Sequence, residues 1–289
     1  MKHELLGYVD QATEGFGFAI AREYLQARIL QHIGLSGQMT SLAFMGGTAL
    51  RFLYGVPRYS EDLDFALETN QDSYAFGDVL GVIARGFERE GYEVDIKFNQ
   101  SRTAVDKAFV KFPGLLYEIG LSPHASEVLS VKVEVDTNPP AGAICDVSEV
   151  RRFVLIRMYH HDRASLMAGK LAGVLMRQYT KGRDLYDLMW YLSDRSWPQP
   201  NATLLRNAAD RGGFADPASL DAAGWRDAVL ARLSSVDWAK ARGEAVQFLE
   251  RPLEADLLEY ATFERLLCCS TLVARSDARS GIDYGASMT

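Results

Sequence analysis

The feature that most constrains the fold is a pair of glycines between a short apolar run and a segment with helical spacing. Residues 42–45 (LAFM) are typical of a buried strand, and Gly46 and Gly47 allow a tight turn directly after it. Residues 48–54 then repeat apolar positions at helical spacing. A glycine turn at a helix N-terminus directs backbone N–H groups toward an anion, and the Thr48 hydroxyl adds a donor. We therefore expect a phosphate-binding turn, although a Gly-Gly pair in isolation is usually only a turn.

Two aspartates follow the turn on a predicted strand over residues 62–67. Asp62 and Asp64 are two positions apart, so their side chains leave the same face, while Leu63 and Phe65 point toward a core. Two like charges on one face repel, and a cation between them removes that cost. The alternative is an edge strand whose solvent face is acidic.

A third carboxylate is expected from the alternating run at residues 131–136 (VKVEVD). Glu134 is central in this predicted strand, whereas Asp136 lies near the following turn and is its rival. Three carboxylates from neighbouring strands form the oxygen cage of a two-metal site for phosphoryl transfer. We therefore expect Asp62, Asp64 and Glu134 to bind two Mg²⁺ ions.

The remaining pattern predicts an α+β fold with a mixed sheet, followed by helices. Helical spacing covers residues 14–34 and 73–90, and further strands are expected at 92–98 and 108–112. After Pro139-Pro140 helices dominate, with expected segments at 162–179, 184–192, 219–233, 238–248 and 253–267. This order predicts an α+β domain over 1–150, a helical domain over 151–275 and a loosely held tail over 276–289.

The charge balance argues against a protein that coats nucleic acid. The chain has 31 Lys and Arg residues against 38 Asp and Glu residues, a net charge of −7. Eight bases nevertheless fall between residues 151 and 183, with Asp162 as the single acid. These bases are Arg151, Arg152, Arg157, Arg163, Lys170, Arg177, Lys181 and Arg183. A local anion-binding surface and a solvated helix face explain the segment equally well.

The cysteines and histidines show no metal-binding spacing. Cys145 stands alone and Cys268 and Cys269 are adjacent, which suits a reducing interior. His160 and His161 are interpreted as bystanders, because no paired acid or second ligand cluster accompanies them. No apolar run approaches the length of a membrane helix and the N-terminus lacks an apolar signal core, so we expect a cytoplasmic protein with no membrane contact.

Two blocks of sequence resemble a known family. The glycine turn, the Asp62-x-Asp64 pair and the later acidic strand are similar to the nucleotidyltransferase superfamily, which has the polymerase β-like fold. More narrowly, residues 44–67 (FMGGTALRFLYGVPRYSEDLDFAL) resemble the AbiEii toxin family. That family also carries a downstream helix pair similar to residues 170–172 (KLA) and 183–188 (RDLYDL). The resemblance extends from about residue 40 to 192.

The resemblance implies a nucleotidyltransferase that acts as the toxin of a bacterial toxin–antitoxin or phage-defence pair. Such enzymes transfer a nucleotide from an NTP, and relatives modify tRNA 3′ ends, so RNA is the implied acceptor. Asp62 and Asp64 would be the Mg²⁺ ligands by position. Lys170 would hold the NTP phosphates or the developing charge, and Asp184, with Asp187 as its rival, would support catalysis.

The same resemblance completes the expected nucleotide site and its partners. Arg58 and Ser60 precede the two acids and could contact the triphosphate, and Arg183 joins them in the expected NTP-binding set. An antitoxin partner is implied by analogy, without direct contact. Two alternatives stay open: a small-molecule acceptor such as an aminoglycoside, or a catalytically idle module that binds RNA or a partner.

Overall fold

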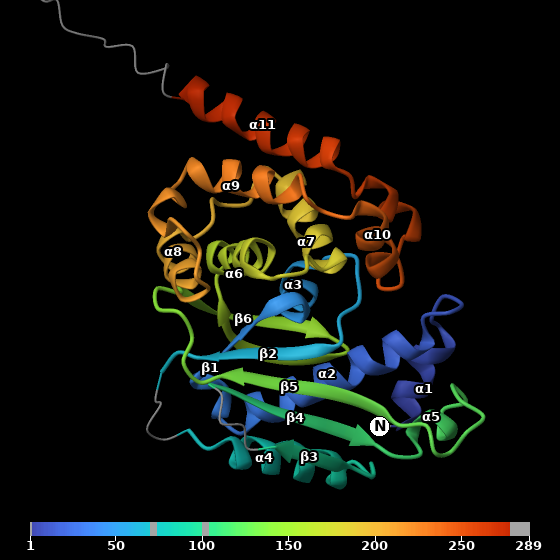
Figure 1. The fold of residues 1–289 in the computed structure, drawn as a ribbon. Coiled ribbons are helices and arrows are strands. Elements are labelled where there is room, and N and C mark those ends of the chain that lie inside the picture. The colour runs from blue at the N-terminus through green and yellow to red at the C-terminus, as the bar shows by residue number, and fades with distance from the viewer. Residues whose placement is uncertain (1, 70–73, 100–103, 278–289) are drawn as a thin grey trace, which may run out of the picture.

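The computed structural model of this chain describes residues 2–69, 74–99 and 104–277. Seven strands form one mixed sheet: β1 (Leu42–Met45), β2 (Asp62–Leu67), β3 (Asp95–Asn99), β4 (Val105–Phe112), β5 (Leu129–Asp136), β6 (Cys145–Arg152) and β7 (Val154–His161). Their order across the sheet is β3-β4-β5-β2-β1-β7-β6 (Figure 1). In the centre, β2 runs antiparallel to β1 and parallel to β5.

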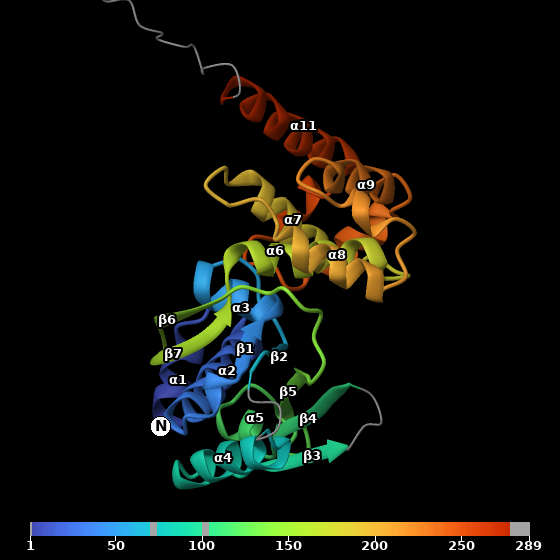
Figure 2. The same ribbon diagram turned by 90° about the vertical axis from the view of Figure 1, so that its left-hand side faces the viewer.

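Helices cover both faces of the sheet. The first part of the chain contributes α1 (Lys2–Asp10), α2 (Gly17–Leu35), α3 (Gly46–Tyr54), α4 (Phe76–Arg89) and α5 (Leu115–Glu118). The second part contributes α6 (Arg163–Met176), α7 (Gly182–Ser193), α8 (Ala202–Arg211), α9 (Gly224–Leu233), α10 (Trp238–Val246) and α11 (Tyr260–Asp277). Figures 1 and 2 show α2 and α4 on one side of the sheet and α6 to α11 on the other. None of these described helices is long and apolar enough to cross a membrane.

Successive side chains of the central strands point to opposite faces of the sheet, one packed in the core and the other polar. Along β5 the three valines at 131, 133 and 135 are fully buried, and the residues between them are half-buried. In β2 the buried side chains include Leu63 and Phe65, whereas Asp62 and Asp64 keep partial exposure. Helix α2 packs against β5 and β7, while α3 contacts β1, β2 and α6. The acidic face of β2 therefore looks toward α3 and α6, since Asp64 lies against Gly46 of α3 and lines one cleft with Lys170 of α6.

The α+β prediction with a mixed sheet and following helices is confirmed, but the sheet extends further along the chain than expected. Residue 150 falls inside β6, and β7 continues to His161. Asp162 then caps α6, accepting a hydrogen bond of 2.7 Å from the Ser165 N–H. We therefore propose Asp162, in place of residue 150, as the boundary between the two parts. The expected tail over 276–289 begins within α11, and its residues 278–289 lie outside the described part of the chain.

Candidate active site

The register between β2 and β5 brings three predicted acids together. The Cα of Asp64 lies opposite that of Glu134, and Asp62 lies opposite Lys132. All four side chains occupy the polar face, because the residues between them are buried in the core. Asp136 pairs instead with Ala66, at the far end of the strand. This register places Glu134, rather than its rival, beside Asp64.

Burial and neighbouring carboxylates raise the pKa of the two aspartates. Burial, followed by the charges of Asp62 and Glu134, raises the pKa of Asp64 to about 6. Burial and the Glu134 charge also raise the pKa of Asp62, against the lowering effect of Lys132. A divalent cation bound among these oxygens would remove the repulsion, and carboxylates are the ligands that Mg²⁺ prefers. The donor set and its charge therefore fit a Mg²⁺ site.

Glu134 differs from the two aspartates in having cationic partners. Its carboxylate lies 2.6 Å from Lys132 Nζ and 3.1 Å from Lys107 Nζ. Burial alone would raise the pKa of Glu134, but the hydrogen bonds from both lysines outweigh it and lower the pKa. Glu134 is therefore ionised at neutral pH, and both ammonium groups compete with any cation that it binds.

The glycine turn lies directly against the acids. Gly46 has φ +79°, and a Cβ on this residue would overlap Asp64 Oδ2. A Cβ on Gly47 would overlap the Arg58 guanidinium and lie 3.1 Å from Ser60 Oγ. Both positions therefore require glycine for close approach, and the N-terminus of α3 begins beside Asp64 as predicted.

The Thr48 hydroxyl has a different role from the one expected. Thr48 is fully buried, and its hydroxyl donates to the backbone carbonyl of Asp62. This bond ties α3 to the first residue of β2. The expected hydrogen bond from Thr48 to a phosphate is therefore not available from this rotamer.

A chain of buried ion pairs faces the acids from the helical part. Lys170 Nζ on α6 lies 3.0 Å from Asp184 Oδ1 and 2.7 Å from Asp187 Oδ2 on α7. Arg58 binds Asp187 through two donors, Nε and Nη2, each at 2.6 Å. Arg177 pairs with the second oxygen of Asp184. Because Arg58 precedes β2, this series of ion pairs connects the sheet to both α6 and α7.

The two rival aspartates of α7 occupy different environments. Asp187 is completely buried between Arg58 and Lys170, whereas Asp184 borders the cleft described below. Burial would raise the pKa of Asp184, but the charges of Lys170 and Arg177 lower it to about 2. Asp184 is therefore an ionised acid at the cleft, and Asp187 holds the two buried cations.

Arg58 and Arg183 are engaged away from the cleft. Arg58 is buried behind the glycine turn, where its donors bind Asp187 and the Tyr59 carbonyl, so the implied contact with a triphosphate has no open path in this arrangement. Arg183 Nη1 lies 2.9 Å from Glu61 Oε2, and Glu61 also pairs with Arg22 at 3.1 Å. These pairs connect α7 and α2 to the segment before β2.

A cleft of about 300 Å³ opens between the glycine turn, the end of β5 and helices α6 to α8. Five of the predicted site residues line it: Gly46, Gly47, Asp64, Lys170 and Asp184. The others lie outside its wall: Thr48, Arg58, Ser60, Asp62, Glu134 and Arg183. One wall is apolar and includes Pro139, Pro140, Leu166, Leu204 and Ala208. The cleft thus combines a charged end with an apolar wall.

The eight bases between residues 151 and 183 do not form one surface, so the anion-binding surface, one of the two interpretations left open, is not present as a single patch. Arg151 and Arg152 lie on β6, at the outer edge of the sheet, and Arg152 pairs with buried Glu23 of α2. Lys170 is buried among the acids of α7. Arg177 is the base of this segment that lines the cleft with Lys170, and 46% of its side chain is exposed.

Comparisons with known proteins agree with this geometry. The family model described as nucleotidyl transferase AbiEii toxin, type IV TA system, matches residues 28–267. The fold is similar to the crystal structure of an H. pylori protein described as a candidate nucleotidyltransferase, with a TM-score of 0.54, 19% identity and coverage of 91% of this chain and 99% of that one. It is also similar to JHP933 from Helicobacter pylori, with a TM-score of 0.52, 18% identity and coverage of 90% and 96%. No curated protein matches the sequence.

The family match covers most of the chain, including the glycine turn, the strand acids and the α6–α7 ion pairs. The two solved structures share the fold over nearly their whole length. The chain therefore belongs to the AbiEii family of nucleotidyl transferase toxins, the toxin component of type IV toxin–antitoxin systems.

Proposed function

We propose that the protein transfers a nucleotide from an NTP to the 3′ end of an RNA, with tRNA as the acceptor, in a Mg²⁺-dependent reaction. The observation that carries the proposal is the position of Asp64. This acid, whose pKa is raised to about 6, lies against the glycine turn and in the same cleft as Lys170. Such a site concentrates negative charge where the Mg²⁺ ions that accompany a triphosphate would supply positive charge.

Asp62, Asp64 and Glu134 are the residues that would hold two Mg²⁺ ions. When bound, such ions neutralise the attacking and leaving oxygens of an in-line displacement at the α-phosphate. The three carboxylates come from adjacent strands of a rigid sheet, so their positions are set by backbone register. Metal-supported transfer of this kind depends mainly on positioning and charge neutralisation.

The other cleft residues would bind and orient the triphosphate. Gly46 and Gly47 at the start of α3 line the cleft with Asp64, so the N–H groups of this helix N-terminus would bind phosphate oxygens there. Lys170 would donate from α6, held in place by Asp184 and Asp187. The apolar wall near Leu166 would accept a nucleobase. The acceptor hydroxyl then attacks the α-phosphate, and pyrophosphate leaves.

RNA is favoured as the acceptor by exposed cations at the cleft. Arg177 lines the cleft with 46% of its side chain exposed, and Arg211 lies 4.0 Å from Asp136, another lining residue, with 43% exposed. Guanidinium groups in such positions bind the phosphates of a polynucleotide. A tRNA substrate implies a cytoplasmic location, and the toxin family implies an antitoxin partner.

The proposal is tested by incubating the protein with total bacterial RNA, Mg²⁺ and each α-³²P-labelled NTP in turn. We expect label in a tRNA-sized band with one NTP, and none after chelation of Mg²⁺ or in Asp62→Ala. Asp95→Ala, exposed on the far edge strand β3, is the matched control and should label normally. Label in small molecules alone would identify a small-molecule acceptor. RNA binding that is unchanged without Mg²⁺ and in Asp62→Ala, with no label transferred, would identify a catalytically idle binding module.

Gly46→Ala is expected to reduce transfer strongly. The added Cβ would overlap Asp64 Oδ2, in addition to a backbone cost of about 1–2 kcal/mol for a non-glycine residue at positive φ. Gly55→Ala is the matched control, since Gly55 has φ +71° but open space around the Cβ position. Urea unfolding should show the backbone cost in both variants, with a larger loss of stability in Gly46→Ala because of the overlap, and labelling should fall in Gly46→Ala alone. Equal activities would contradict the role assigned to this turn.

A further inference from the structure

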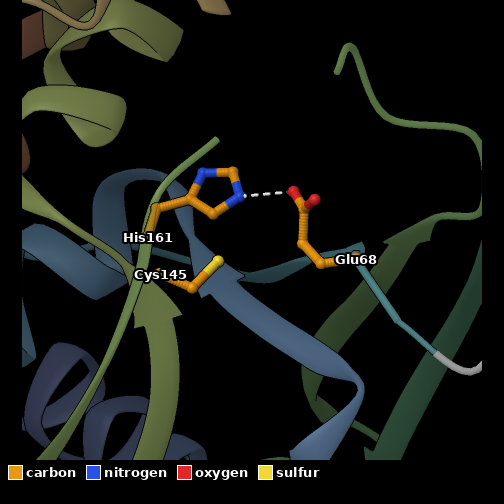
Figure 3. Close-up of side chains that lie close together, drawn as sticks. All are labelled: Glu68, Cys145 and His161. Carbon is orange, nitrogen blue, oxygen red and sulfur yellow. Dashed lines mark hydrogen bonds and ion pairs between the residues drawn. The ribbon is translucent and has the colours of Figure 1, made fainter. Parts of the chain in front are cut away.

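Three side chains, two from neighbouring strands and one from the residue after β2, meet at a second place on the sheet. Cys145 and His161 are direct cross-strand partners at the ends of β6 and β7, and Glu68 follows β2. His161 Nε2 lies 2.8 Å from Glu68 Oε1, and one ligand atom of each residue lies within 4.8 Å of the others (Figure 3). The expectation that no acid is paired with His161 is therefore wrong, because that acid, Glu68, is distant in sequence.

The surroundings of this cluster favour a cation. His161 is only 5% exposed, Glu68 is mostly buried and Cys145 is half-buried. Burial, followed by the charges of the carboxylates Glu68, Asp162 and Asp146, raises the pKa of the Cys145 thiol. Tyr159 forms a hydrogen bond with the same sulfur. Hydrogen bonds to ligating atoms are typical of the second layer around a metal.

The chemistry of the donors separates this cluster from the Mg²⁺ site. Thiolate and imidazole are the ligands of Zn²⁺ and similar transition metals, whereas the cage around Asp64 offers carboxylate oxygens alone. Zinc–ligand bonds of about 2.0–2.3 Å in tetrahedral geometry place ligand atoms about 3.3–3.8 Å apart. The observed separations need shifts of about 1 Å, which side-chain rotation supplies.

We propose that Glu68, Cys145 and His161 bind one Zn²⁺ ion. Binding displaces the thiol proton of Cys145 to solvent, and the neutral imidazole and the ionised carboxylate complete a three-residue set. The fourth position is left for water or for a ligand entering from the cleft, since His161 also lines the cleft that contains Asp64 and Lys170. The site would thus place a second kind of metal ion beside the nucleotide site.

The test uses the full-length protein, stripped of metal with a chelator and then titrated with Zn²⁺ or Co²⁺. We expect one equivalent of Zn²⁺ to survive desalting, measured by elemental mass spectrometry, and Co²⁺ to show thiolate-to-metal charge-transfer absorption. Cys145→Ser should lose that absorption and bind Zn²⁺ at least about tenfold more weakly. Cys268→Ser is the matched control and should behave as the unmodified protein. Asp64→Asn should retain Zn²⁺, which separates this proposal from the proposed reaction.

The proposal also has a readout that needs no variant. Bound Zn²⁺ should protect Cys145, but not Cys268, from alkylation, as measured by peptide mass spectrometry.

Glu68→Gln and His161→Gln, on two other segments, should weaken Zn²⁺ binding even if Cys145→Ser does not fold. A Co²⁺ adduct without thiolate absorption, or equal alkylation of Cys145 with and without Zn²⁺, would overturn the assignment.

Discussion

Asp64→Asn is expected to lose about 100- to 1,000-fold or more of the transfer rate while making the metal-free protein more stable at pH 7. The loss of rate follows from the loss of a charged oxygen in the proposed Mg²⁺ cage. The gain in stability follows from the raised pKa of Asp64, about 6 against an ordinary value of 3.8. Ionising this buried acid at pH 7 therefore costs the folded state about 2–3 kcal/mol.

The sign of the effect can be followed with pH. The folded protein binds the Asp64 proton more tightly than the unfolded chain does, so this group's contribution to stability falls as pH rises from about 4 to about 6. Urea unfolding in EDTA should show a steeper fall in the unmodified protein than in Asp64→Asn, in which only Asp62 keeps a raised pKa at this site. Mg²⁺ should restore stability at pH 7 only when Asp64 is present. Wild-type labelling by Asp64→Asn would remove Asp64 from the proposed cage.

Asp187→Ala is expected to destabilise the protein by about 3–5 kcal/mol, because it leaves buried cations without their partner. Arg58 would lose both of its 2.6 Å hydrogen bonds, and Lys170 would keep Asp184 alone. The measurement is the free energy of unfolding in urea. Asp184→Asn should cost less stability, since Asp184 borders the cleft and its partner Arg177 reaches solvent.

A double variant separates the unpaired charge from lost packing. Arg58→Met combined with Asp187→Leu removes both charges of the pair, so it should recover part of the stability lost in Asp187→Ala. Lys170 keeps Asp184 in this background. If the free energy of unfolding of Asp187→Ala lies within about 1 kcal/mol of that of the unmodified protein, then water or a rearranged side chain solvates Arg58 and Lys170 in the variant.

The local parts of the site could be predicted from the sequence. They depend on the alternation of side chains along a strand and on the tight turn that glycine allows. The turn at Gly46 and the shared face of Asp62 and Asp64 follow from residues that are close in the chain. The pairing of Glu134 with Asp64 is a matter of register between strands, and the central position of Glu134 was a sufficient guide to it.

The remaining contacts join residues that no local pattern connects. Arg58 and Asp187 are 129 positions apart, and Glu68 and His161 are 93 apart. Strands β6 and β7 were missed as well, because they mix exposed charges with exposed apolar residues such as Val147 and Leu155. Of the two, β6 is the edge strand, and edge strands lack the clear alternation that burial on one face imposes.

The ion pairs across the junction have a consequence for how this chain can be divided. Arg58 comes from the sheet part and Asp187 from the helical part, and both are buried. A fragment that ends at Asp162 would contain Arg58 without its carboxylate partner Asp187. The complementary fragment would contain Asp187 and Lys170 without Arg58. We therefore expect that neither half folds alone, that the chain unfolds in a single cooperative step, and that it loses function when it is split at Asp162.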